Sequence, residues 1–523
     1  MLTVLSFLAF TGFVAFFSWY HLRKESLQST EGFFLGGRSL TGVVIAGSMV
    51  LTNISTEHLI GMNGSAYKDG FIIIAWEVTS AVALAIAALY FLPKYLKMGL
   101  TTIPEYLERR FDGTTRTLVA FFLIVSFVVS LLPIVLYTGA INFESIFEVS
   151  ATLGISESQG ILLMVWSIGL LGSVYAIFGG LKAVAYSDTL NGYGLLLGGL
   201  LVPIFALWEI GSGNLWQGLT TVYEHAPEKF NVIGASDSVL PFEVLFTGLI
   251  INQLYFWGMN QTIIQRALGA KNLKEGQKGL LYAGVLKILI PLIIILPGTI
   301  AFYYFGESLY ESSDSVYPAL VKRVLPASLT GFFAAVVMGA VLSTFNSVLN
   351  SAATIFSMGI FQRLIRPQAD DRQLVRVGKI TSAILAVIAM IVAPSVANAP
   401  AGLYDLLQKL NGIFFIPIAS ILLAGFFLPR VSAKAAKTGL LFGLSFYILV
   451  TFVLEADLHY VHVWGIEFLL NMGIMLGISY FQPRTESMAE TPQVVELEPW
   501  RYAKPLGIAL SVITVLIYIW LAQ

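Results

Sequence analysis

Long apolar stretches, separated by short polar segments, run through the whole chain. Fourteen of these stretches are long enough to cross a bilayer as a helix, which takes roughly 17–25 residues. They lie near 2–20, 41–66, 70–93, 117–143, 158–178, 184–208, 241–265, 279–305, 328–361, 377–396, 402–428, 437–454, 460–481 and 503–522. The pattern predicts an all-α integral membrane protein with about 14 transmembrane helices.

The second stretch, 41–66, is interrupted in its middle by the polar segment Asn53-Ile54-Ser55-Thr56-Glu57-His58. A charged side chain near the centre of a bilayer costs at least ~2.5–3.5 kcal/mol, so a continuous helix is disfavoured there. A short loop between two spans is the alternative, but residues 40–50 alone are too short to cross. We therefore expect a helix that breaks near 52–58 and uses its freed backbone groups to hold a ligand.

Five spans later, the stretch at 241–265 is interrupted by polar groups of its own, Asn252-Gln253 and then Asn260-Gln261. Interruptions at corresponding places in two halves of a chain are typical of inverted repeats. The sequence therefore predicts a single transmembrane domain over 1–523. It would contain a first five-helix repeat at 41–208, a second at 241–428, an extra N-terminal helix at 2–20 and three extra C-terminal helices at 437–522.

The composition excludes several classes of function. Hydrophobic residues make up 57% of the 523 residues and charged residues only 12%, whereas a soluble domain has roughly 25% charged residues. The chain has no cysteine, and its net charge of −1 gives no field that would attract nucleic acid. The five histidines have no metal-ligand spacing, and there is no nucleotide-binding loop or nucleophile elbow. We therefore expect neither an enzyme nor a pump driven by ATP from this chain alone.

Lysine and arginine are distributed unevenly among the segments that connect the spans. If the N-terminus lies outside, most of the 30 basic residues fall on the cytoplasmic side, and only Lys68, Lys229, Lys322 and Arg323 fall on the other side. This asymmetry agrees with the positive-inside rule. It predicts a multi-pass protein of the plasma (inner) membrane with both termini extracytoplasmic.

Several spans carry polar residues far from their ends, among them Glu77 and Ser80 on one helix face and Lys287 in an apolar run. Snorkelling of Lys287 to the interface and isolated interhelical hydrogen bonds are the alternatives. We instead expect one hydrophilic pocket in which Glu77 compensates the charge of Lys287. Its polar groups and aromatic faces suit a neutral polyhydroxylated ligand, and they come from His58, Trp76, Glu77, Ser80, Gln253, Phe256, Trp257, Lys287 and Gln408.

The ninth stretch carries a stripe of small and hydroxyl-bearing residues on one helix face: Ala340, Ser343, Thr344 and Ser347. This stripe has two interpretations. It can serve close helix packing, as small residues commonly do. It can also form a Na⁺ site, together with carbonyls released where the second span breaks. Asp188, early in the sixth span, would supply a carboxylate on the path of the ion.

At these residues the chain resembles the solute:sodium symporter family, close to its sodium–glucose/galactose branch, over nearly its whole length. The most specific matches are Asn53-Ile54-Ser55-Thr56-Glu57-His58-Leu59-Ile60-Gly61, Trp76-Glu77-Val78-Thr79-Ser80, Tyr255-Phe256-Trp257-Gly258-Met259-Asn260-Gln261, Gln265-Arg266, Lys287 with Pro291, Ser343-Thr344 through Asn350-Ser351, and Gln408. The resemblance implies a LeuT-type fold of five plus five helices with extra helices.

The resemblance also implies a role for each site residue. Substrate contacts would come from His58, Glu77, Ser80, Gln253, Lys287 and Gln408. Phe256 and Trp257 would form the inner gate, and Met62 and Tyr404, with Trp76, would close the outer side. Na⁺ would bind the carbonyls of Leu51, Ile54 and Ala340 and the hydroxyls of Ser343 and Thr344. Asp188, Ser347 and Asn346 would match a second sodium site or an exit path.

The sequence departs from the family pattern at four of these positions. Phe256 replaces a tyrosine, Gln253 replaces a shorter polar residue, Thr344 replaces a serine, and Asn346 replaces a hydroxyl-bearing residue. The resemblance implies a sodium-driven symporter that imports a hexose or related polyol by alternating access. Another small solute, such as sialic acid or inositol, is the first alternative, and a channel or membrane enzyme is the alternative from a different class.

Overall fold

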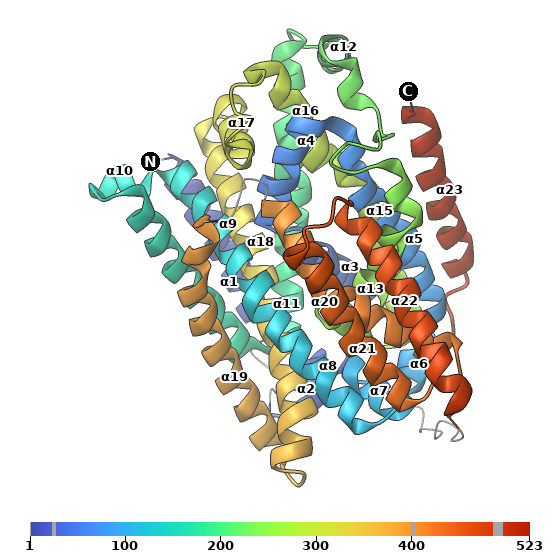
Figure 1. The fold of residues 1–523 in the computed structure, drawn as a ribbon. Coiled ribbons are helices and arrows are strands. Elements are labelled where there is room, and N and C mark those ends of the chain that lie inside the picture. The colour runs from blue at the N-terminus through green and yellow to red at the C-terminus, as the bar shows by residue number, and fades with distance from the viewer. Residues whose placement is uncertain (1, 23–27, 399–402, 485–494, 523) are drawn as a thin grey trace.

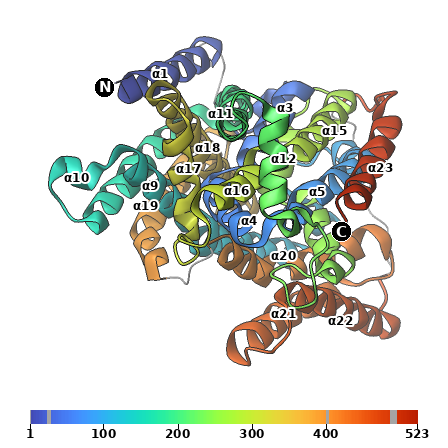
Figure 2. The ribbon, with the colours of Figure 1, turned by 90° about the horizontal axis from the view of Figure 1, so that it is seen from above.

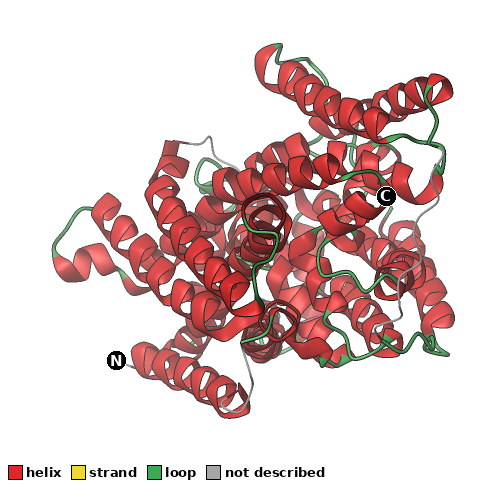
Figure 3. Ribbon diagram, turned by 90° about the horizontal axis from the view of Figure 1, so that it is seen from below, coloured by secondary structure: helices red, strands yellow, loops and turns green. Residues whose placement is uncertain are grey.

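The computed structural model describes residues 2–22, 28–398, 403–484 and 495–522, and these residues form helices and loops without a strand (Figure 3). The first residue of the expected 402–428 span lies outside the described residues. The first half of the chain forms α1 (Leu2–Leu22), α2 (Thr30–Leu35), α3 (Gly42–Asn53), α4 (Asn63–Asp69), α5 (Ala75–Ile86), α6 (Leu92–Lys97), α7 (Ile103–Arg110), α8 (Gly113–Ser126), α9 (Leu132–Phe147), α10 (Val149–Leu153) and α11 (Glu157–Ile210).

The second half continues in the same way and ends with three helices beyond the second predicted repeat. It forms α12 (Leu215–His225), α13 (Gly248–Gly258), α14 (Gln261–Leu268), α15 (Leu273–Leu289), α16 (Pro291–Phe305), α17 (Val316–Val324), α18 (Ala327–Thr354), α19 (Asp371–Val392), α20 (Leu403–Phe427), α21 (Ala433–Ile448), α22 (Tyr460–Phe481) and α23 (Ala503–Leu521). Short π-helical segments extend several of them, for example Ile355–Ile365 after α18.

Ten helices within the described residues are long and apolar enough to cross a membrane, and α1 and α3 contain shorter apolar segments. Each of the fourteen expected stretches is mostly helical where it is described. Helix α11 runs for 54 residues and covers two of them, but Gly180 interrupts it with φ 61° and ψ −175°. The number of 14 membrane crossings stays a prediction, because some of these helices cover two expected stretches and two expected stretches are broken into shorter helices.

The helices form one elongated bundle (Figure 1). Both chain ends lie at the same end of the bundle, together with α12 and α17, while α2 and α7 lie toward the opposite end. Viewed along the bundle, α1 and α10 lie at one edge, α21 and α22 lie at the opposite edge, and α4 and α16 lie near the middle (Figure 2). Helices α1, α21 and α22, which lie outside the two predicted repeats, are therefore peripheral.

The two expected helix breaks are present. Helix α3 ends at Asn53, Ile54 is extended with φ −86° and ψ 101°, and a π-helical segment starts at Glu57. The second break lies at Met259 and Asn260, between α13 and α14, where the Asn260 side chain accepts a hydrogen bond from the Thr262 N–H at 2.9 Å.

One detail of the second break differs from the sequence prediction. Asn252 and Gln253 were expected to interrupt the span, but both lie inside the continuous helix α13. The amide of Gln253 bonds to Ser80 and Trp76 of the neighbouring helix α5 instead of to its own backbone, so α13 tolerates it. Of the two polar pairs, only Asn260-Gln261 lies at a helix break, between the end of α13 and the start of α14.

Candidate functional site

A cavity lies where the break after α3 faces α5, α13, α15 and α20. Polar and aromatic side chains from these five helices line it together. It is lined by Thr52, Asn53, Glu57, His58, Trp76, Glu77, Ser80, Leu131, Asn252, Gln253, Phe256, Trp257, Asn260, Thr262, Ile263, Lys287, Thr344, Val348, Tyr404, Leu407, Gln408, Asn411 and Phe415. All six expected substrate contacts are among these residues, so the polar groups of separate spans do meet in one pocket.

Glu77 on α5 and Lys287 on α15 form an ion pair in this cavity. Each side chain is only 1% exposed, so the expected pairing is confirmed and the snorkelling alternative for Lys287 is wrong. The Lys287 ammonium also donates to Asn53 Oδ1 at 2.7 Å and lies 5.3 Å from the centre of the Trp257 ring. The last residue of α3 is thereby tied to α15, which fixes the break relative to the ion pair.

Gln253 on α13 joins this helix to α5 in the lining of the cavity. Its Oε1 accepts hydrogen bonds from Ser80 Oγ and from Trp257 Nε1, each at 3.1 Å. Its Nε2 donates to the Trp76 carbonyl at 2.9 Å. Because most of the hydrogen-bonding capacity of this amide is used within the protein, Gln253 holds α5 and the Trp257 indole in place as well as facing the cavity.

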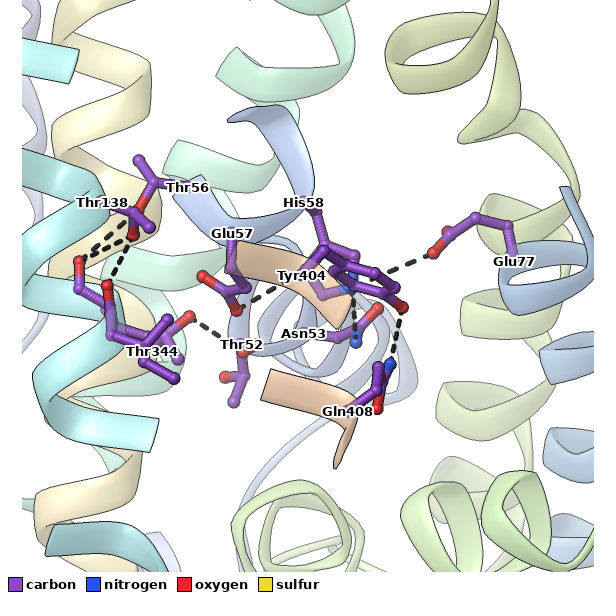
Figure 4. Close-up of polar contacts among 12 residues, drawn as sticks. Thr52, Asn53, Thr56, Glu57, His58, Glu77, Thr138, Thr344, Tyr404 and Gln408 are labelled. Atoms are coloured by element: carbon purple, nitrogen blue, oxygen red, sulfur yellow. Dashed lines mark hydrogen bonds and ion pairs between the residues drawn. The ribbon is translucent and has the colours of Figure 1, made fainter. Parts of the chain in front are cut away.

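His58 lies between two carboxylates (Figure 4). Its Nδ1 is 3.5 Å from Glu57 Oε1, and its Nε2 is 4.0 Å from Glu77 Oε1. The Tyr404 ring packs edge-on against the imidazole, with centroids 5.4 Å apart, and its hydroxyl accepts a hydrogen bond from Gln408 Nε2 at 2.8 Å. Helix α20 therefore closes over the broken helix at this end of the cavity.

Four of the five expected gate residues line the cavity, and the fifth lies outside its lining. Trp76, Phe256, Trp257 and Tyr404 line it, and the Trp76 and Tyr404 rings pack edge-on with centroids 5.9 Å apart. Met62 is completely buried but does not line the cavity. The structure thus groups four of the five expected gate residues around the cavity.

Sequence reasoning missed several residues that line the cavity. Asn53, Glu57, Asn252, Asn260 and Asn411 were not assigned to the site, although all five lie in or beside the polar segments that indicated it. A broken helix exposes side chains on more than one face near the break, so helical periodicity could not separate Asn53, Glu57 and Asn260 from their neighbours. Asn252 and Asn411 lie inside the continuous helices α13 and α20. Their polarity inside an apolar span was the available signal.

The hydroxyl stripe of α18 packs against the end of α3. Thr344 Oγ1 donates to the Thr52 carbonyl at 2.9 Å, and Ser347 Oγ lies 3.0 Å from Thr52 Oγ1. Ser343 Oγ is buried and has no hydrogen-bond partner among the described residues. Helix α3 ends two residues after Leu51, which frees carbonyls of its last turn. Hydroxyl and carbonyl oxygens of this kind are the hard ligands that a small alkali cation requires.

A second polar cluster lies next to this stripe. Asp188 Oδ2 accepts a hydrogen bond from Ser48 Oγ at 2.7 Å, and the completely buried Arg266 donates to Ser48 at 3.3 Å and to Ser347. Asp188 Oδ1 and Asn346 Oδ1 are buried without a hydrogen-bond partner in the described part of the chain. The residues expected at a second ion site therefore lie beside a fixed guanidinium that the sequence prediction did not include.

A cavity between two broken helices, lined by polar and aromatic side chains and with freed carbonyls and hydroxyls beside it, is the arrangement of a secondary transporter. Comparison with known proteins identifies the family. The model of the sodium:solute symporter family matches residues 33–443. The chain belongs to this family, and it is a sodium-coupled transporter, not an enzyme.

The relatives extend over most of the chain. It is 45% identical over 523 residues to the uncharacterized symporter YidK of Escherichia coli K12, covering 100% of this chain and 91% of the relative. It is 34% identical to the sodium/glucose cotransporter of Vibrio parahaemolyticus, covering 82% of this chain and 81% of that protein. It is 31% identical to the sodium/myo-inositol cotransporter of Bos taurus, covering 82% of this chain and 63% of that protein.

A solved structure shares the fold. A Na⁺-coupled sialic acid symporter in a substrate-bound, outward-open state has a TM-score of 0.76 and 19% sequence identity. The likeness covers 94% of this chain and 99% of that chain. The expected LeuT-type all-α fold is thus confirmed, and Na⁺ is the coupling ion.

Proposed function

We propose that this protein uses the sodium gradient to import a hexose or a related polyol by alternating access. The observation that carries the proposal is the Glu77–Lys287 ion pair, buried in a cavity that amides and aromatic rings line. A paired carboxylate and ammonium offer acceptors and donors to hydroxyl groups without presenting a net charge. Trp76 and Trp257 add apolar faces of the kind that pack on the C–H face of a sugar ring.

In this proposal Na⁺ binds between α3 and α18, at the carbonyls of Leu51, Ile54 and Ala340 and the hydroxyls of Ser343 and Thr344. The orphaned Ser343 hydroxyl and the end of α3 at Asn53 support the assignment. Because Asn53 also receives a hydrogen bond from Lys287 at 2.7 Å, an ion that orders the end of α3 also orders the substrate cavity. That shared element couples the two binding events.

Access from each side is controlled by different residues in the proposal. Phe256 and Trp257 would separate the cavity from the cytoplasm, and Met62 and Tyr404, with Trp76, would separate it from the outside. The five-helix repeats at 41–208 and 241–428 would move against each other around the site. Both termini would be extracytoplasmic, and both lie at one end of the bundle (Figure 1).

One sodium ion is sufficient for this task. Movement of one Na⁺ across about 100 mV with a roughly tenfold gradient releases ~3.7 kcal/mol, which supports about 500-fold accumulation of a neutral solute. A second ion would bind Asp188, Asn346 and Ser347. The unpartnered oxygens of Asp188 and Asn346 favour such a site, whereas the guanidinium of Arg266, which donates to Ser347, opposes it.

The cavity lining favours neutral substrates over acidic ones. An acidic substrate such as sialic acid requires a free cation, but no arginine is among the described residues that line the cavity. Arg266 lies instead among Ser48, Thr262 and Ser347. A neutral polyol, either a hexose or an inositol, fits the lining better than an acid does.

Uptake into proteoliposomes tests the proposal. The purified protein would be exposed to an inward Na⁺ gradient and, as the control, to a K⁺ gradient of equal size, with D-glucose, D-galactose, myo-inositol, D-glucuronate and sialic acid each as substrate. We expect saturable, Na⁺-dependent uptake of at least one neutral compound. Uptake of the acids alone, or equal uptake in K⁺, would refute the proposed function.

A further inference from the structure

Glu57 is a carboxylate of the cavity that the ion pair does not use. It lies at the start of the π-helical segment that follows the break, and it is only 2% exposed. Its Oε1 faces His58 Nδ1 at 3.5 Å (Figure 4). Its Oε2 is buried and has no hydrogen-bond partner among the described residues, and neither has His58 Nδ1. A buried acceptor without a partner is costly, so an arriving ligand that donates to it recovers that cost.

The carboxylates that line the cavity outnumber the ammonium groups. Among the described lining residues, Glu57 and Glu77 are the carboxylates, and Lys287 is the ammonium. Lys287 is committed to Glu77 and to Asn53. His58 lies beside Glu57, and the same imidazole also faces Glu77 at 4.0 Å. A substrate that brings a carboxylate to this edge therefore meets a like charge.

We propose that Glu57 determines which solutes the site accepts. Its unpartnered Oε2 accepts hydrogen bonds from hydroxyl or ammonium groups of the substrate, and its charge excludes sugar acids. The inference rests on the proposed function and narrows it to neutral and amine-bearing sugars or polyols. Exclusion by a like charge is a form of specificity that requires no additional attractive contact.

The experiment compares three probes with the same ring: D-glucose, D-glucosamine and D-glucuronate. Each is titrated against the purified full-length protein in saturating Na⁺, with quenching of intrinsic tryptophan fluorescence as the binding signal and proteoliposome uptake as the transport signal. The variants are Glu57→Gln, which removes the charge, and Glu57→Asp, which keeps it. Glu467→Gln is the matched control, because Glu467 is also completely buried but lies on α22 outside the cavity lining.

In the wild type we expect glucuronate to bind at least about 100-fold more weakly than glucose, and glucosamine to bind about as well as glucose. Glu57→Gln reduces the ratio of glucose affinity to glucuronate affinity at least about tenfold, and it lowers the affinity for glucosamine by a similar factor. Glu57→Asp keeps glucuronate excluded while it weakens the two other probes, because its shorter side chain withdraws the acceptor. Glu467→Gln leaves the relative affinities of the three probes unchanged.

Different results overturn different statements. If the wild type binds and transports glucose but Glu57→Gln leaves the glucose-to-glucuronate ratio unchanged, the role of Glu57 is refuted while the proposed function stands. If none of the three probes is bound or transported, and none of the other neutral compounds of the uptake panel is transported either, both are refuted. If Glu57→Gln cannot be purified as a folded protein, Glu57→Asp decides, because unchanged binding of all three probes by that variant contradicts the inference.

Discussion

The Glu77–Lys287 pair gives the most demanding test of how this site is built. Both side chains are 1% exposed, so removal of either partner leaves a charge that water cannot solvate unless the site opens. Breaking such a pair costs about 3–5 kcal/mol. At 1.4 kcal/mol per tenfold change, this corresponds to roughly two to three and a half orders of magnitude in affinity or in the folded fraction.

The two single variants are not equivalent in this environment. Glu77→Gln leaves the Lys287 ammonium with Asn53 Oδ1 at 2.7 Å as an acceptor. Lys287→Met leaves two carboxylates, Glu57 and Glu77, that both face His58, and removes the ammonium that compensates Glu77. We therefore expect Lys287→Met to lower the thermal stability more than Glu77→Gln does, and each to lose substrate binding. The double variant carries neither charge and should recover folded yield without recovering transport.

The measurements are thermal unfolding of the purified protein and Na⁺-driven uptake in proteoliposomes. Asp405→Asn provides a matched control, because Asp405 pairs with Lys409 at 2.8 Å but the two side chains are 35% and 41% exposed. That exposed pair contributes at most about 1 kcal/mol, so its loss should change neither property much. Uptake at wild-type affinity by either single variant of the buried pair would refute the reasoning, since no sugar site built on this pair tolerates its loss.

Three further predictions test other parts of the molecule. Ser343→Ala or Thr344→Ala should raise the Na⁺ concentration required for half-maximal uptake at least about tenfold, because each variant removes one hard oxygen ligand. Counterflow in saturating Na⁺ should survive better than uptake at low Na⁺, and an unchanged Na⁺ dependence in both variants would leave the stripe as helix packing. Trp257→Ala should abolish accumulation in an uptake assay, because it removes the indole that bonds to Gln253 at 3.1 Å; normal accumulation would place the gate elsewhere. Asp112 caps α8 and pairs with Lys437 at 2.6 Å. Burial raises its pKa, but hydrogen bonds from Lys437 and Thr115 outweigh burial and leave the pKa below the usual value. The carboxylate therefore contributes its stability above about pH 4 and loses it as the pH falls through the lowered pKa. Asp112→Ala should cost about 1 kcal/mol at pH 7. Asp112→Asn should flatten the loss of thermal stability in acid, and a pH profile identical to the wild type would contradict the assignment.

The sequence by itself determined the helical class, the position of the first break and the main chemistry of the cavity. In a bilayer, backbone groups must be satisfied within helices and charges are costly, so the polar segment at 53–58 and the lone Glu77 and Lys287 were strong signals. Their pairing followed because each charge required a partner at the same depth. The structure confirms that pair.

Tertiary structure alone decided how each polar group is used. Gln253 was expected at the break and as a substrate contact, yet α13 continues through it because its amide bonds to α5 and to Trp257. Glu57 and His58 are adjacent in sequence, but the π-helical segment after the break turns both toward the cavity. Regular helical periodicity would separate neighbouring residues by about 100°. The direction of a side chain at a broken helix depends on the backbone geometry of the break, which residue spacing does not encode.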